Sequence, residues 1–200
     1  MEVCANDLIT QTQIKCKIPV TMRGDLELRC GLDFEKYKYL SNIQANIGKF
    51  VEQGCNLYIY SKYTGNGKTS WAVKLLNQYI RNVYDKKDSL IGLFVNVDDF
   101  LVTQIKPLHL NQSFIATCKN VDLLILDDIG CSKLTSIEEQ ILRDIINTRL
   151  LNRKSTIYTS NRIDDGLCDT VGLNLGSKII DSSVIVELTN NSQRKPIDMK

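Results

Sequence analysis

A glycine-containing loop between a short apolar segment and a helical pattern is the feature that most limits how this chain can fold. Residues 56–60 (Asn-Leu-Tyr-Ile-Tyr) are aromatic and β-branched, which is typical of a buried strand. The loop Gly65-Asn66-Gly67-Lys68-Thr69 follows, and a helix is predicted from about residue 68 to residue 83. The loop matches the end of the pattern G-x-x-x-x-G-K-[ST], although Lys62 stands where that pattern has its first glycine. This order of elements predicts an α/β fold with a phosphate-binding loop.

The residue types in the loop suit a polyphosphate chain. The backbone amides of residues 65–67 can turn inward to form an anion-binding nest, which requires residues without a bulky Cβ. Lys68 can reach the β- and γ-phosphates, and the Thr69 hydroxyl can bind Mg²⁺. We therefore expect ATP or ADP with Mg²⁺ as ligands, rather than a chance turn ahead of a helix. The predicted nucleotide-binding residues are Thr64, Gly65, Asn66, Gly67, Lys68, Thr69 and Ser70.

Two acidic residues follow the most apolar segment of the chain. Residues 123–126 are Leu-Leu-Ile-Leu, and Asp127 and Asp128 come directly after them. Ligands of open α/β sheets bind at the carboxyl ends of the strands, so these carboxylates are expected beside the loop. Asp127 is predicted to hold Mg²⁺ together with Thr69, and Asp128 to polarise the attacking water. Asn161 follows the next strand and could hydrogen-bond that water or the γ-phosphate; simple strand-end turns are the alternative interpretation.

Strands and helices alternate along the rest of the chain. The strands are continuously apolar, which is typical of a parallel sheet covered by helices on both faces. Ser136 and Glu139 are predicted to form a capping box at the start of one helix. The predicted fold is a three-layer α/β sandwich with a five-stranded, mainly parallel sheet and little or no separate lid domain. Strands are predicted at 56–60, 91–97, 121–126, 155–159 and 184–188, and helices at 34–51, 68–83, 98–105, 136–152 and 173–180.

Composition excludes several other classes of protein. The chain has 200 residues, enough for one domain, and its net charge of +2 excludes a strongly basic histone-like protein. A single histidine, His109, excludes metal sites with several histidines, and no two of the seven cysteines have CxxC spacing. No apolar run approaches the roughly 18 residues that span a bilayer, and no signal peptide is recognisable. These features predict a soluble, cytoplasmic protein with reduced cysteines.

These segments together resemble a known family. The phosphate loop, Leu-Ile-Leu-Asp-Asp-Ile-Gly at 124–130, Ile-Ile-Asn-Thr-Arg at 145–149 and Ser-Thr-Ile-Tyr-Thr-Ser-Asn at 155–161 look like AAA+ ATPases of the DnaC-type replicative helicase loaders. The compact phage versions and the related IstB-type transposition helpers are the most similar. The resemblance covers about residues 34–194 and implies a P-loop NTPase of the AAA+ (ASCE) class.

The resemblance also implies roles for individual positions. Asn161 matches the sensor-1 asparagine, and Arg194 falls where these proteins carry a sensor-2 arginine that contacts the γ-phosphate. Asn174 and Lys178 occupy positions where the family has arginines that act on the ATP of a neighbouring subunit. Lysine keeps the charge but lacks the planar fork of arginine, so weak hydrolysis by the isolated chain is expected. The predicted catalytic residues are Lys68, Asp128, Asn161, Lys178 and Arg194.

The implied function is that of an ATPase that delivers a hexameric replicative DNA helicase to single-stranded DNA during replication. The family also implies an oligomer of the chain in the ATP state and a bacterial cytoplasm, and the small size hints at a phage gene. Residues 34–194 would form the ATPase domain, with a tail at 195–200. Residues 1–33 would form a short N-terminal segment, and either this segment or a surface of the ATPase domain would contact the partner.

Other interpretations stay open. The chain could be a non-catalytic inhibitor that binds a helicase or its loader, which Asn174 and Lys178 favour. It could also be an IstB-type transposition helper, since that group shares the motifs. A small-molecule P-loop kinase is a more distant alternative, because the Thr-Ser-Asn segment at 159–161 and Arg194 argue against it.

Overall fold

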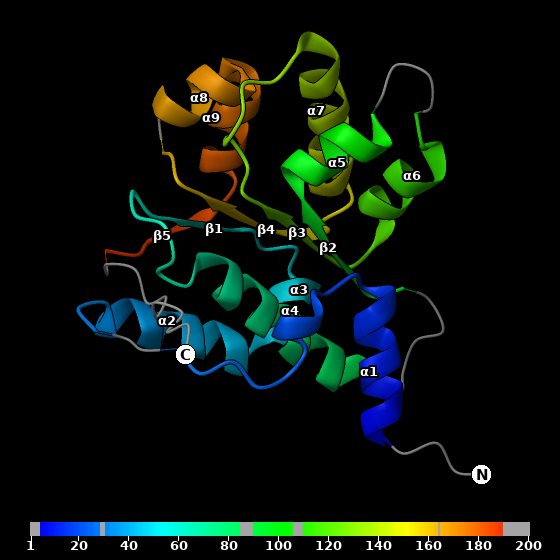
Figure 1. The fold of residues 1–200 in the computed structure, drawn as a ribbon, viewed down its shortest axis with the longest axis vertical. Helices are drawn as coiled ribbons and strands as arrows, with labels where there is room; N and C mark the ends of the chain where they lie inside the picture. Colours follow the sequence, from blue (N-terminus) through cyan, green and yellow to red (C-terminus); the bar gives the residue numbers. More distant parts are fainter. Residues whose placement is uncertain (1–4, 29–30, 85–89, 106–109, 164, 190–200) are drawn as a thin grey trace, which may run out of the picture.

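A parallel sheet forms the middle layer of the protein (Figure 1). The computed structural model describes residues 5–28, 31–84, 90–105, 110–163 and 165–189. The strands are β1 (Leu57–Tyr60), β2 (Gly92–Asn96), β3 (Leu123–Asp127), β4 (Ser155–Ser160) and β5 (Val184–Glu187). Their order is β2-β3-β4-β1-β5, and all four neighbouring pairs are parallel. The predicted five-stranded α/β fold is therefore confirmed, with a sheet that is wholly parallel.

Helices cover both faces of the sheet (Figure 1). One face carries α1 (Ala5–Lys15), α2 (Phe34–Ala45), α3 (Ile47–Glu52) and α4 (Lys68–Val83). The other carries α5 (Val97–Gln104), α6 (Gln112–Asn120), α7 (Ser136–Leu151), α8 (Asp165–Val171) and α9 (Leu173–Asp181). Along β1, Leu57 and Ile59 pack into one core and Tyr58 and Tyr60 into the other. This two-sided burial explains why β1 and β3 are apolar at nearly every position. Within the described ranges, no helix is long and apolar enough to cross a membrane.

Two helix boundaries differ from the prediction for local reasons. The predicted helix 34–51 is divided into α2 and α3 at Asn46, whose Nδ2 donates to the Asn42 carbonyl at 3.0 Å. Asparagine side chains that bond the nearby backbone compete with helical pairing. The predicted capping box is wrong by one residue. Thr135 caps α7 and pairs with Glu138, because Thr135 has the extended backbone that an N-cap requires.

Three helices, α1, α6 and α8, lie in segments for which no helix was predicted. All three are short, at 11, 9 and 7 residues. In α1 only Gln13 is buried, so the segment offers no apolar face that a sequence pattern could reveal.

The described part of the N-terminal segment packs against α4. Cys16 and Ile18 are buried in the core on that face of the sheet. Gln13 Nε2 donates to Asn77 Oδ1 of α4 and to the Arg23 carbonyl, both at 2.9 Å. The Phe94 amide of β2 donates to the Cys16 carbonyl at 2.8 Å. Residues up to 28 are thus attached to the same cores as the strands and helices that follow.

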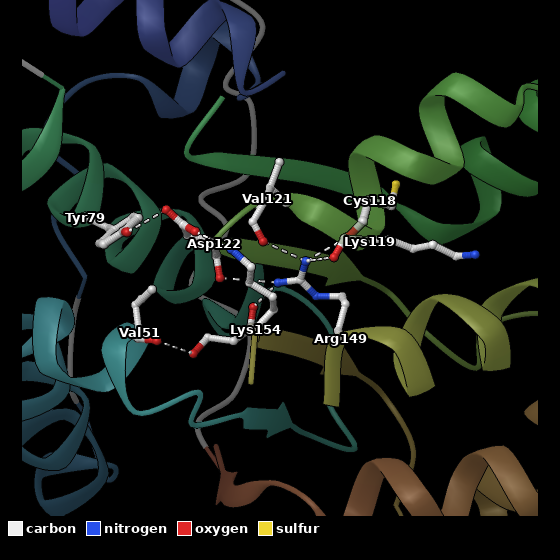
Figure 2. A network of polar contacts seen from close by, with 9 residues as sticks. Val51, Tyr79, Cys118, Lys119, Val121, Asp122, Arg149 and Lys154 are labelled. Atoms are coloured by element: carbon white, nitrogen blue, oxygen red, sulfur yellow. Dashed lines mark hydrogen bonds and ion pairs between the residues drawn. The ribbon is translucent and has the colours of Figure 1, made fainter. Parts of the chain in front are cut away.

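Arg149 joins α7 to α6, to the turn before β3 and to β4 at the amino end of the sheet (Figure 2). Its side chain is fully buried and extends from α7. Nη1 donates to the Cys118 and Val121 carbonyls, both at 2.8 Å, and Nε donates to Thr156 Oγ1 at 2.9 Å. Nη2 donates to the Ser155 carbonyl. Burial lowers the pKa of Arg149 to about 10, so the guanidinium stays charged at neutral pH.

Candidate nucleotide-binding site

A cavity of about 630 Å³ lies at the carboxyl ends of β1, β3 and β4. Three parts of the chain line it: the N-terminal segment, the loop between β1 and α4, and the residues that end β3 and β4. The lining residues are Met22, Glu27, Leu28, Thr64, Gly65, Gly67, Lys68, Thr69, Ser70, Asp127, Asp128 and Asn161. The structure therefore brings together the predicted loop, metal and water-orienting residues in one space, apart from Asn66, which is buried behind the loop.

The loop has the backbone conformation that binding of an anion requires. Gly65 and Gly67 have positive φ angles of 75° and 97°, a region that residues with a Cβ rarely adopt. α4 begins at Lys68, and its N-cap residue is Gly67, which has no side chain to cap the first turn. The helix dipole favours an anion at this end of the helix.

Lys68 lies at the base of the loop with its side chain buried. Its Nζ donates to the Tyr63 carbonyl at 2.9 Å and to Asn66 Oδ1 at 3.3 Å. Both of these acceptors are neutral oxygens, and they hold the ammonium next to the cavity.

Asp127 is held by Thr159 on the neighbouring strand. The Thr159 hydroxyl donates to Asp127 Oδ1 at 2.6 Å, and both side chains are buried. Burial raises the pKa of Asp127, hydrogen bonds from Thr159, Thr69 and Asn96 lower it, and the charge of Asp128 raises it further. A buried carboxylate beside a hydroxyl is a donor set that fits Mg²⁺, which takes oxygen ligands.

Asp128 has an unusual backbone for a residue with a side chain. Its φ angle is +59°, and its amide donates to Thr159 Oγ1 at 3.0 Å. Thr159 thus fixes both acidic residues through one hydroxyl. Such conformations occur at functional sites when the surrounding structure imposes them. Sequence analysis recognised Thr159 only as part of the segment before Asn161, and its hydrogen bonds to the acidic pair emerge only from the adjacent strands.

Asn161 lines the cavity. Its Oδ1 is buried and has no hydrogen-bond partner among the residues that the structure describes. Buried polar atoms are nearly always hydrogen-bonded, so an exception calls for a specific explanation. A water or a ligand group in the cavity would supply the missing donor.

Two predicted catalytic residues are not placed at this cavity. Lys178 lies on α9, where its Nζ donates to Asn147 Oδ1 of α7 at 2.6 Å. Asn174 lies exposed on the same helix. Arg194 falls outside the described residues. The roles of Lys178 and Arg194 therefore stay predictions.

Sequence analysis missed the contribution of the N-terminal segment. Met22, Glu27 and Leu28 line the cavity opposite the strand ends. Lys74 Nζ donates to the Leu26 carbonyl at 3.2 Å, and Asn77 Nδ2 to the Met22 carbonyl at 2.9 Å. These contacts hold the segment on α4, and no motif in residues 22–28 signals them.

Comparisons with known proteins agree with this geometry. The family described as "IstB-like ATP binding protein" matches residues 25–198. The chain is 24% identical over 127 residues to the uncharacterized protein YdaV of Escherichia coli K12, covering 64% of this chain and 50% of that protein. It is 25% identical over 173 residues to the replicative helicase loader DnaC of Buchnera aphidicola subsp. Schizaphis graminum, covering 79% of this chain and 65% of that protein. The matches therefore span half to somewhat under two thirds of these relatives' length.

Solved structures give the same result. A crystal structure of the DnaC helicase loader is similar with a TM-score of 0.56 and 26% identity, over 72% of this chain and 86% of that one. The structure of AMPPCP-bound DnaA from Aquifex aeolicus has a TM-score of 0.61 and 25% identity, over 82% of this chain and 48% of that one. A crystal structure of DnaI shares the fold, with a TM-score of 0.66 at 19% identity, over 88% of this chain and 94% of that one. The predicted resemblance to AAA+ proteins of the DnaC type is confirmed.

Proposed function

The chain belongs to the family of IstB-like ATP-binding proteins, and from this membership we propose that it is a Mg²⁺-dependent ATPase that loads a hexameric replicative helicase onto single-stranded DNA. In this proposal ATP favours an oligomer of the chain that grips the DNA. Hydrolysis then releases the loader from the helicase.

One observation carries the ATPase part of the proposal. The glycine loop, the Asp127–Thr159–Asp128 arrangement and the unpartnered Asn161 Oδ1 converge on one cavity. Each group matches a need of phosphoryl transfer: binding of phosphates, binding of a cation and orientation of water.

The residues would divide the chemistry as follows. Lys68 and the loop amides would bind the β- and γ-phosphates, and Asp127 and Thr69 would hold the cation. When bound, Mg²⁺ would neutralise charge that develops on the phosphate oxygens. Asp128 would orient the attacking water and accept its proton, while Asn161 Oδ1 accepts a hydrogen bond from that water. The isolated chain would hydrolyse ATP slowly, because Lys178 would act only on a neighbouring subunit.

The loader part of the proposal is supported by similarity to DnaC. The match to the replicative helicase loader covers 79% of this chain, and a DnaC crystal structure shares the fold. A transposition helper is the second candidate, because the matching family is described as IstB-like. Such a helper would bind DNA and a transposase rather than a helicase.

The decisive experiment is size-exclusion chromatography with light scattering of the protein mixed with a hexameric replicative helicase. A complex that forms with ATP and is lost in Lys68→Ala is expected. Lys62→Ala is the matched control, since Lys62 is an exposed lysine of the same loop. The control variant should bind the helicase as the unaltered protein does.

The outcomes separate the candidate functions. Accumulation of helicase on single-stranded DNA would support loading. A stable complex with neither ATP turnover nor helicase on the DNA would replace the loader with an inhibitor. No complex with several helicases would contradict both, and DNA-dependent filaments would then favour the transposition helper.

A further inference from the structure

Asn66 differs from the other residues of the phosphate loop because its side chain faces the protein interior. It is fully buried and does not line the cavity. Its Oδ1 accepts a hydrogen bond from Lys68 Nζ at 3.3 Å. Its Nδ2 donates to Ser61 Oγ and, at 3.3 Å, to the Leu188 carbonyl just after β5. One amide thus connects the phosphate-binding lysine to a segment 122 residues away.

The segment that Asn66 contacts is itself fixed on its other side. The Thr189 amide donates to both Asp33 carboxylate oxygens at 2.9 Å, and the Thr189 hydroxyl donates to Oδ1 at 2.7 Å. Asp33 is buried and precedes the first residue of α2. The Leu188 amide donates to the Tyr60 carbonyl at 2.8 Å, which holds the segment on β1.

Helix α2, which follows Asp33, also packs close to the phosphate loop. Tyr37 of α2 is buried, and its hydroxyl would lie 3.5 Å from a Cβ placed on Gly67. Its ring packs edge-on against Trp71 of α4 at 5.1 Å between centroids. A continuous set of contacts therefore connects the phosphate loop, Leu188–Thr189, Asp33 and α2. We call this set the loop clamp.

We propose that Asn66 is a positioning residue that couples phosphate binding at the loop to the segment 188–189 through the loop clamp. The inference rests on the proposed nucleotide site. A ligand that moves the Lys68 ammonium changes its contact with Asn66 Oδ1, and the same amide holds Leu188. Coupling between sites is reciprocal. In this proposal phosphate binding strengthens the contacts at 188–189, so loosening Thr189 weakens nucleotide binding although Thr189 does not line the cavity.

The test is calorimetric binding of ADP with Mg²⁺ to the full chain and to three variants. Thr189→Val keeps the size of the side chain and removes the hydroxyl bonded to Asp33. We expect it to weaken ADP about fivefold, and Asn66→Ala about tenfold, since one hydrogen bond typically contributes about 1 kcal/mol. Thr148→Val is the matched control, because its hydroxyl bonds the Asp144 carbonyl within α7, at 2.8 Å, and no other of the described residues. Its ADP affinity should change less than twofold.

A second readout separates positioning from a general loss of stability. Hydrogen exchange of the Leu188 and Thr189 amides should slow when ADP binds the unaltered protein. In Asn66→Ala, ADP at saturating concentration should no longer change their exchange. If Asn66→Ala does not fold, Thr189→Val alone carries the affinity test, and thermal unfolding without ligand checks its fold.

The possible results have distinct meanings. Weaker binding in Thr189→Val with an ADP effect on exchange at 188–189 supports the coupling. Unchanged ADP affinity in Thr189→Val, or exchange at 188–189 that ignores ADP, would overturn the coupling and leave the proposed ATPase intact. Failure of the unaltered protein to bind ADP would overturn both.

Discussion

Asp127 lies at the candidate site in surroundings that disfavour its charged form. Its carboxylate is buried and next to a second carboxylate, and burial raises its pKa. Between the ordinary carboxyl pKa and the raised value, the folded protein binds more protons than the unfolded chain. The free energy of unfolding therefore falls as pH rises through that window. A bound cation would offset this loss, so the residue ties stability to Mg²⁺.

Replacing Asp127 by asparagine tests this balance. Asp127→Asn keeps an oxygen for the Thr159 hydroxyl and removes the buried charge, so we expect the free energy of unfolding to rise by about 1 kcal/mol at pH 7 without Mg²⁺. Urea denaturation measures this free energy of unfolding. The stabilisation that ADP with Mg²⁺ gives the unaltered protein should be lost in the variant. Asp99→Asn, at an exposed position, should change stability by less than about 0.5 kcal/mol. Lower stability of Asp127→Asn would contradict the prediction.

Asp128 is expected to act on water rather than on binding. Asp128→Asn should keep ADP affinity within about twofold, while ATP turnover with DNA and helicase present falls about 100-fold or more. Phosphate release and calorimetry measure the two quantities. Equal turnover by the variant and the unaltered protein would remove Asp128 from the proposed mechanism.

Among the elements, α7 depends on a buried charge at its carboxyl end. Arg149 donates hydrogen bonds to one carbonyl near the end of α6 and to another just before β3, and it also bonds residues of β4. It thereby satisfies backbone groups that a helix end and strand starts would otherwise leave unpaired. The guanidinium is far along the strands from the phosphate loop, so its role here is to hold the sheet's amino end together.

Substitution of Arg149 should affect stability more than binding. Arg149→Met leaves several buried carbonyls without donors, and we expect a loss of about 3 kcal/mol in the free energy of unfolding. Arg143→Met on the same helix removes an ion pair with Glu139 at 3.8 Å, whose side chains are 39% and 28% exposed, and should cost less than about 1 kcal/mol. Denaturant titration of both variants compares their free energies of unfolding. Similar values for the two variants would show that the carbonyl contacts contribute little.

The elements differed in how far sequence could predict them. β1 and β3 were predictable because their buried, apolar residues form local runs, and α4 because its apolar spacing is regular. α1 was not, because its contacts depend on α4, more than 50 residues later, as with Gln13 and Asn77. The α7 cap was placed one residue late because Thr135 and Ser136 both fit the same pattern, and only backbone geometry distinguishes them.

At the scale of the whole molecule, the candidate site unites a local motif with distant parts of the chain. The loop and the acidic pair were predictable because their chemistry depends on close spacing along the sequence. Met22, Glu27 and Leu28 were not, because the packing of residues 5–28 on α4 brings them there. The tie between Asp33 and Thr189 likewise has no sequence pattern, since 156 residues separate the two.

The proposed partner-binding role of residues 1–33 can be tested without damaging the core. Ile14 is about half-exposed on α1, whereas Cys16 and Ile18 are buried, so deletion of the segment would also remove core residues. Ile14→Asp should weaken the helicase complex about tenfold and leave ADP affinity unchanged. Ile137→Asp, at an exposed isoleucine on α7, is the control and should bind as the unaltered protein does. Equal binding by both would place the partner contact elsewhere.

The loop clamp also has a consequence for the order in which the protein becomes active during its synthesis. The phosphate loop and both acidic residues emerge from the ribosome well before residues 188–189, which complete the contacts around Asn66 and Asp33. Contacts between residues so distant along the chain form slowly, after local structure. On this proposal a nascent chain carries the phosphate loop and the acidic pair before it has the support that would position them, and tight nucleotide binding would begin only once β5 and the two residues after it have been translated.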